Sequence, residues 1–149
     1  MGIIEFNNFK VINAYEIDVQ NKDETLIVLN NLNKDYDFII CHNWHIEKNL
    51  LTDVFPYPSL KEKNENRRWG PWLDSLRVYK TFYPNLESYE LLNLSKTFLK
   101  EDQIKLTIEE ICPKYKKFNP HNALYDATGS FLLIKRLADK FNLSNFLQQ

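Results

Sequence analysis

The chain has 149 residues, of which 44% are hydrophobic and 14% aromatic, so one folded domain over residues 1–149 is expected and a disordered chain is excluded. Its 19 Lys and Arg residues nearly balance 20 Asp and Glu residues, and the net charge of -1 excludes a global positive field that would attract nucleic acid or anionic membrane. Only three glycines occur, too widely separated for a glycine-rich phosphate loop.

Targeting signals are not evident in the sequence. No apolar run approaches the length of a membrane span, and the first ten residues lack the basic and apolar regions of a signal peptide, so we expect a cytoplasmic protein without a membrane partner. Two cysteines make no disulfide framework. An alternative use for them is a zinc site, with Cys41, His45, Cys112 and His121 as the four ligands.

The first third of the chain alternates strand and helix signals. Residues 9–17 are rich in β-branched and aromatic side chains, which predicts a strand. Asn21 followed by Glu24 predicts a capping box that opens a helix through Leu32. The continuous apolar run 38–41 is typical of a central parallel strand covered on both faces.

The remaining elements follow from prolines and from the spacing of apolar residues. In order we expect a helix over 44–55, a long surface loop over 56–71, a short strand at 72–76 leading into a helix, a helix over 86–99, a helical turn at 107–111, and the longest helix from 122 onward. Strands alternating with helices predict an α/β fold whose ligands bind at the carboxyl ends of the strands.

An acidic residue lies within the apolar face of the expected helix 44–55. On a helical wheel Ile46, Leu50, Leu51 and Val54 share one face, which we expect to be buried, and Glu47 falls inside it. A carboxylate there pays a desolvation cost, which a metal ion at the strand ends would offset. The alternative is a first helical turn in which Glu47 reaches solvent and only favours the helix dipole.

The last helix has a similar feature. Asp126 lies at the margin of its apolar stripe, on the same flank as Leu133 and Leu137. His121 precedes a good N-cap, Asn122, so we expect it on the incoming loop, where it can swing over the same site. The alternatives are an Asp placed for the helix dipole and an exposed loop histidine.

Three segments resemble motifs of the DEDDh group of 3'-5' exonucleases, which have the ribonuclease H-like fold. Residues 38–47 are similar to the second motif, with an apolar strand, His-Asn, and an acidic residue four positions after the Asn. Residues 72–77 look like the strand and helix that follow. Residues 121–127 match the third motif, in which a His is separated by four residues from an Asp, and the likeness extends over about residues 9–140.

The resemblance implies a fold and a mechanism. The fold would be a ribonuclease H-like mixed sheet flanked by helices, and the activity would be hydrolysis of phosphodiester bonds at the 3' end of single-stranded DNA or RNA. Two divalent metal ions, Mg or Mn, would position the attacking water and the leaving oxygen. His121 would be the general base, and Asp126 and Glu47 would be metal ligands, with Glu47 standing where the family has Asp.

The first motif of the family, Asp-x-Glu on the opening strand, is not found, so we expect a sheet that lacks the family's first strand. Glu16 with Asp18, and Glu5, are the nearest substitutes, and we interpret them as surface residues. Two alternatives to an enzyme that is active as a single chain follow. A second chain could supply the Asp-x-Glu strand, or the fold could be inactive and serve as a nucleic-acid-binding or assembly module.

Residues that could contact a nucleic acid lie beside these motifs. Lys114, Tyr115 and Lys117 combine cations with an aromatic ring just before His121, a composition typical of single-strand binding. An ordinary solvated connector is the alternative. Asn43 and Trp44 directly follow the apolar strand and are expected on the substrate side, although Trp44 could equally pack at the start of its helix.

Overall fold

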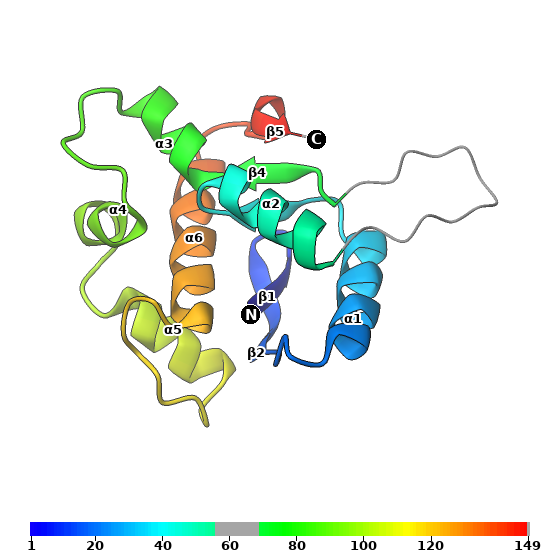
Figure 1. The fold of residues 1–149 in the computed structure, drawn as a ribbon. Coiled ribbons are helices and arrows are strands. Elements are labelled where there is room, and N and C mark those ends of the chain that lie inside the picture. The colour runs from blue at the N-terminus through cyan, green and yellow to red at the C-terminus, as the bar shows by residue number, and fades with distance from the viewer. Residues whose placement is uncertain (56–68, 149) are drawn as a thin grey trace.

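The structure, a computed structural model, describes residues 1–55 and 69–148. In chain order the elements of this part are β1 (Gly2–Asn7), β2 (Lys10–Glu16), α1 (Lys22–Asp35), β3 (Ile39–Cys41), α2 (Trp44–Val54), β4 (Trp72–Asp74), α3 (Ser75–Phe82), α4 (Leu91–Phe98), α5 (Gln103–Ile111), α6 (Ala123–Ala138), a 3-10 turn η1 (Ser144–Phe146) and β5 (Leu147–Gln148). The fold is therefore α/β (Figure 1). Most of the predicted loop 56–71 lies outside the described residues.

The strands form two separate sheets. β1 and β2 make an antiparallel hairpin, while β4 pairs in parallel with β3 and antiparallel with β5. β4 is thus the central strand and β3 an edge strand, so the prediction that 38–41 is a central strand is wrong. An apolar run indicates buried side chains but does not say on how many sides a strand is paired. In keeping with an edge position, Ile39 and Ile40 are only half-buried.

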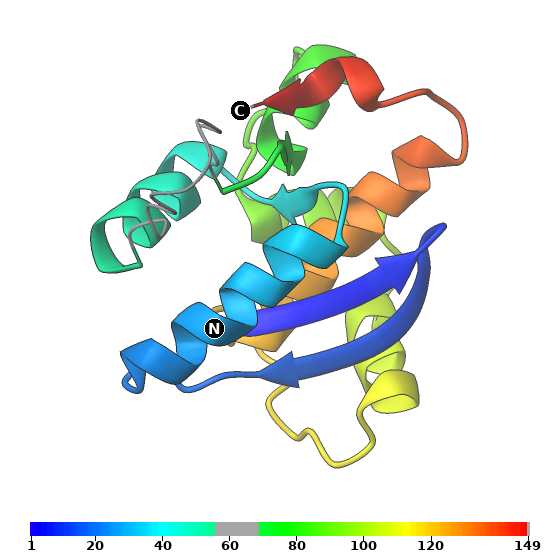
Figure 2. The same ribbon diagram turned by 90° about the vertical axis from the view of Figure 1, so that its right-hand side faces the viewer.

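Helix α6 is the element on which both sheets rest (Figures 1 and 2). It contacts strands β1, β2 and β3 as well as helices α3, α4 and α5. Every residue from 128 to 134 is buried, so the middle of this helix is enclosed on all sides rather than amphipathic. Because α6 is held by so many elements, the residues at its start have a defined position relative to both sheets.

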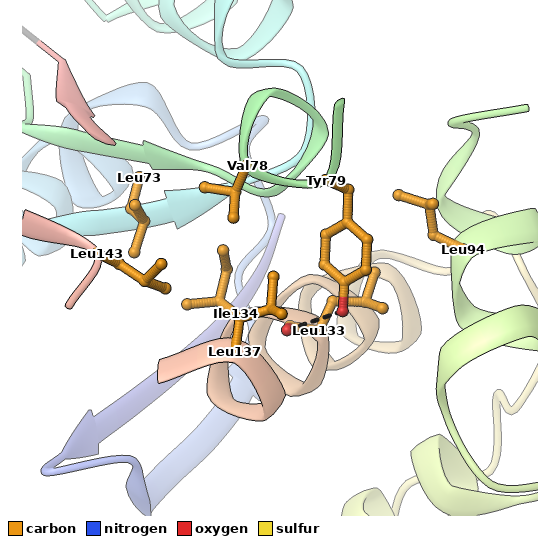
Figure 3. Packing of buried hydrophobic residues seen from close by; sticks show 8 residues of the cluster. All are labelled: Leu73, Val78, Tyr79, Leu94, Leu133, Ile134, Leu137 and Leu143. Carbon is orange, nitrogen blue, oxygen red and sulfur yellow. Dashed lines mark hydrogen bonds between the residues drawn. The ribbon is translucent and has the colours of Figure 1, made fainter. Parts of the chain in front are cut away.

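The main hydrophobic cluster lies between α6, α3 and the mixed sheet (Figure 3). Tyr79 on α3 is fully buried, and its hydroxyl donates a hydrogen bond of 3.1 Å to the backbone carbonyl of Leu133. Burial raises the pKa of Tyr79 to about 12, so the phenol stays neutral. The cluster comprises Leu73, Val78, Tyr79, Leu94, Leu133, Ile134, Leu137 and Leu143.

Two helix starts agree with the sequence. The Asn21 side chain accepts a hydrogen bond of 3.3 Å from the Glu24 backbone N–H at the start of α1, as the capping signal predicts. α6 begins directly after Asn122 and is the longest helix among the described residues. The Asn122 side chain, however, makes no capping bond and donates instead to the Asn119 carbonyl at 3.0 Å.

Two helix boundaries in the middle of the chain differ from expectation. The helix predicted over 86–99 begins only at Leu91, because residues 86–90 form an irregular segment after the turn at 84–85, in which the Tyr89 hydroxyl donates to the Tyr83 carbonyl at 2.7 Å. The turn predicted at 107–111 is the end of a longer helix, α5, that starts at Gln103. Apolar spacing alone does not show where local side-chain bonds end a helix.

Candidate functional site

A pocket of about 620 Å³ lies where the carboxyl end of β3 meets the start of α6. His42 and Asn43 line it from the β3 side, and His121 and Asp126 line it from the α6 side. Residues from the second and third motif-like segments, far apart in the sequence, therefore face one cavity. Its volume lies in the range of about 300 to 1,000 Å³ that small-molecule sites occupy.

A buried carboxylate fixes the turn that carries His42 and Asn43. Asn43 has a left-handed backbone, with φ of 68°, which Asn tolerates better than most residues. Its N–H donates to Oδ1 of Asp74 at 2.8 Å, and the same oxygen accepts from the Leu76 N–H at 2.9 Å. Asp74, only 3% exposed, thus caps α3 and anchors the neighbouring turn at once.

The ring of His42 is held in place rather than free. Its Nδ1 lies 2.8 Å from Oγ of Ser75, which is fully buried. Burial lowers the pKa of His42, and the opposing influences of Asp74, the Tyr89 carbonyl and Asp126 do not fully offset it. His42 is therefore a neutral, positioned side chain in the pocket wall at neutral pH.

Asp126 and His121 are adjacent at the opening of α6. His121 lies on the incoming loop, as expected, with a left-handed φ of 70°. Its backbone N–H donates to Oδ1 of Asp126 at 3.3 Å, and its side chain is exposed. Burial raises the pKa of the half-buried Asp126 carboxyl, against the lowering effects of the His121 N–H and of the His121 and His42 rings in their protonated forms.

Glu47 does not line this pocket, and the prediction of a core-facing apolar stripe around it is wrong. Ile46 is 54% exposed and Leu50 is 56% exposed, while Leu51 is the residue of α2 that is buried. The wheel identifies an apolar face but does not tell which face meets the sheet. Glu47 reaches solvent, and the protein beside its carboxyl removes enough water to raise its pKa.

Trp44 occupies the start of α2 outside the pocket lining. Its ring centroid lies 4.3 Å from that of His45, and Nζ of Lys48 lies 4.6 Å from the centroid of Trp44. It also packs against the buried cluster that contains Trp72. In this structure Trp44 covers the beginning of the helix, whereas its neighbour Asn43 reaches the pocket.

The residues between α5 and α6 form a connector, defined here as 112–122, that leads to the pocket. Tyr115 and Lys117 both bond Glu16 at the end of β2. Lys114 is exposed on the same segment. The ring of Tyr115 packs against a core cluster, and its hydroxyl is bonded to Glu16.

Several pocket residues have no counterpart among the residues predicted from sequence. Lys80, Tyr89 and Glu90 line the cavity, and Nζ of Lys80 lies 5.6 Å from the centroid of the Tyr89 ring. The sequence pattern predicts Tyr89 and Glu90 inside a helix. Pro84 and the capping-type residue Ser88 were the signals that could have indicated a turn there.

The donor groups of the pocket do not fit a two-metal centre by themselves. Two divalent ions about 4 Å apart need several carboxylates between them, and the pocket presents Asp126 and Glu90. Across residues 1–55 and 69–148 no three His, Cys, Asp or Glu side chains gather in a metal-binding cluster. The same holds for the alternative zinc ligands Cys41, His45, Cys112 and His121, which do not form one site.

No membrane span is found among the helices of the described residues, since none is both long and apolar enough to cross a bilayer. Comparisons with protein-family models, curated proteins and solved structures give no match for this chain. The fold class is α/β, and the likeness to exonuclease motifs stays a prediction.

Proposed function

We propose that this chain is a nucleic-acid-binding module of exonuclease-related, ribonuclease H-like fold, and that its pocket receives the 3' end of a single strand of DNA or RNA. The observation that carries the proposal is the convergence of His42 and Asn43 with His121 and Asp126 on one cavity. The first pair belongs to the segment that resembles the second motif of that family, and the second pair to the segment that resembles the third motif.

Local cations support the same proposal. The exposed amines of Lys114, Lys116 and Lys117 lie on the connector that leads into the pocket, and Lys80 lies in the pocket wall beside Tyr89. A phosphate backbone running along the connector would meet these amines in turn. Because the net charge is only -1, binding depends on this local set and should weaken steeply with salt.

Hydrolysis is a separate matter from binding in this proposal. Asp126 and Glu47 would be metal ligands and His121 the general base only in a centre with further carboxylates, because the pocket alone does not fit two ions. The isolated chain is therefore proposed to bind a strand without cleaving it. Asp126 and His121 then serve to hold the terminal nucleotide by hydrogen bonds.

A labelled oligonucleotide tests this proposal. Purified chain is incubated with a 5'-labelled single strand in Mg²⁺ or Mn²⁺, beside Asp126→Ala, and both binding and degradation are followed. We expect saturable binding without degradation, and weaker binding of a strand whose 3' end carries a bulky block. Degradation by the wild-type chain that disappears in Asp126→Ala would instead establish hydrolysis. Absence of binding would refute both binding and hydrolysis for the isolated chain.

A split enzyme is the second candidate, and the position of β3 favours it. In its parallel pairing with β4, β3 directs the backbone groups of Ile39 and Cys41 toward β4 and those of Ile40 toward the opposite edge. An Asp-x-Glu strand from a second chain could pair at that edge. Nuclease activity that appears only after addition of an Asp-x-Glu strand peptide would support this candidate, and continued inactivity would count against it.

A further inference from the structure

One carboxylate holds the connector 112–122 in place. Oε1 of Glu16 accepts a hydrogen bond of 2.7 Å from the Tyr115 hydroxyl, and Oε2 accepts one of 3.2 Å from Nζ of Lys117. Oε1 also lies 3.4 Å from the backbone N–H of Leu124 in the first turn of α6. Glu16 thereby joins the end of β2, the connector and the helix that carries Asp126.

The groups that Glu16 holds are those that a phosphate would use. An ammonium and a phenolic hydroxyl both donate to oxyanions, and a carboxylate and a phosphate offer them the same kind of acceptor. We infer that Glu16 is an affinity-determining residue of the proposed nucleic-acid interface, because its carboxylate competes with the phosphates of a bound strand for Lys117 and Tyr115. The inference rests on the proposed function and adds a residue that limits its affinity.

A phosphate can replace the Glu16 carboxylate at Lys117 on physical grounds. Lys117 is 64% exposed, and an ion pair in such contact with water is weak, so an incoming phosphate can displace the carboxylate. Burial tends to raise the pKa of Glu16, but the hydrogen bonds from Tyr115 and Lys117 outweigh it and lower that pKa. Glu16 is therefore ionised at neutral pH and cancels one cation of the connector when no strand is bound.

The connector carries several cations, so the loss of one of them to Glu16 should affect the binding of a phosphate. Lys114 and Lys116 are exposed beside Lys117, and Nζ of Lys116 donates to the Pro113 carbonyl of the same segment at 3.1 Å. Glu16 is the one acidic side chain that the described contacts place on these cations. Its removal should release a full positive charge toward a ligand, without a change in the cations themselves.

A charge-matched pair of variants tests the inference. Glu16→Gln and Glu101→Gln each remove one negative charge, but Glu101 is exposed in the turn between α4 and α5. Affinity for a single-stranded oligonucleotide is measured by fluorescence anisotropy over a salt series, with thermal melting as a check of folding. We expect Glu16→Gln to bind about 3 to 10 times more tightly than Glu101→Gln, with a salt slope steeper by about 0.7.

A double-variant cycle shows whether Glu16 acts through its partners. In a chain that carries Lys117→Ala and Tyr115→Phe, the further change Glu16→Gln should no longer tighten binding. Glu16→Asp, which keeps the charge but withdraws it by one methylene, provides a second release of the connector if Glu16→Gln folds poorly, and it too should bind more tightly than wild type.

The outcomes separate this inference from the proposed function. If wild type binds the oligonucleotide and Glu16→Gln binds no more tightly than Glu101→Gln, the competition is refuted and the proposed function stands. The competition is refuted in the same way if Glu16→Gln still tightens binding in the background that lacks the Lys117 and Tyr115 donors. If wild type, Glu16→Gln and Glu101→Gln all fail to bind, both the proposed function and the competition are refuted.

Discussion

At the residue scale, Asp74 shows how a single buried carboxylate supports the site without lining it. One oxygen accepts the N–H groups of Asn43 and Leu76, so the turn after β3 and the first turn of α3 depend on the same atom. A buried N–H left without an acceptor is costly, and a lost helix cap adds to that cost. Asp74 therefore couples the position of Asn43 to the stability of the sheet.

Asp74→Ala is expected to lower the free energy of unfolding by about 2 to 3 kcal/mol, and Asp74→Asn, which keeps an acceptor oxygen, by clearly less. Urea unfolding measures both. Asp53→Ala, at an exposed position of α2, is the matched control and should change stability by no more than about 0.5 kcal/mol. Equal losses at the two positions would show that Asp74 does not anchor the turn.

Asp126 should make the stability of the folded chain depend on pH. Burial raises its pKa in the folded chain, so the folded state holds the proton more tightly than the unfolded state does. Protonated Asp126 therefore favours the folded state at low pH, and this contribution to the free energy of unfolding is lost as the pH rises through the pKa of Asp126 in the folded chain. Asp126→Asn should raise the free energy of unfolding at pH 7 by up to about 1 kcal/mol, and the gain should vanish below about pH 4.

Urea unfolding at a series of pH values checks this, with Asp53→Asn as the exposed control. A loss of stability in Asp126→Asn at pH 7, or a gain that persists unchanged in acid, would contradict the account.

At the element scale, helix starts with local signals could be predicted from the sequence. The N-cap side chain of Asn21 and the position of Asn122 each depend on residues next to them, and both helices begin where expected. The third motif-like segment also places His121 on a loop and Asp126 in the first turns of α6, as predicted. These features could be predicted because each of them is determined by residues that are close together in the sequence.

Features that depend on distant residues could not be predicted. Whether Ile46 and Leu50 face the core depends on which side of α2 meets the sheet, and that is decided by the packing of Leu51 and Phe55. The place of Tyr89 in the pocket wall depends on an irregular segment before α4, in which its hydroxyl bonds the Tyr83 carbonyl. Periodicity reports a helical face, but tertiary contacts decide the direction in which it points.

At the scale of the whole molecule, the division into two sheets is the main architectural feature. The hairpin and the mixed sheet both rest on α6 (Figure 2), yet neither pairs with the other among the described strands. They meet through side chains instead, with the rings of Phe6 and Phe38 5.9 Å apart between centroids. Among the described strands, β3 is one of the two edge strands of the mixed sheet.

Hydrogen exchange reports on that edge. The backbone N–H of Ile39 is bonded to the Pro71 carbonyl at 2.8 Å, and that of Cys41 points the same way, whereas that of Ile40 points toward the open edge. We expect the Ile40 amide to exchange faster than those of Ile39 and Cys41 in the isolated chain. Selective protection of Ile40 by an added strand would support the split-enzyme candidate, and slow exchange of Ile40 in the isolated chain would contradict an open edge.

The central claim is that the pocket between β3 and α6 binds the 3' end of a single strand, and the three histidines of the chain test it most directly. His42 and His121 line the pocket, whereas His45 lies exposed on α2 outside its lining. In an NMR titration with a short single-stranded oligonucleotide, the ring signals of His42 and His121 should shift together and saturate while those of His45 stay in place. A shift confined to His45, or no shift at His42 and His121 under saturating conditions, would contradict the account.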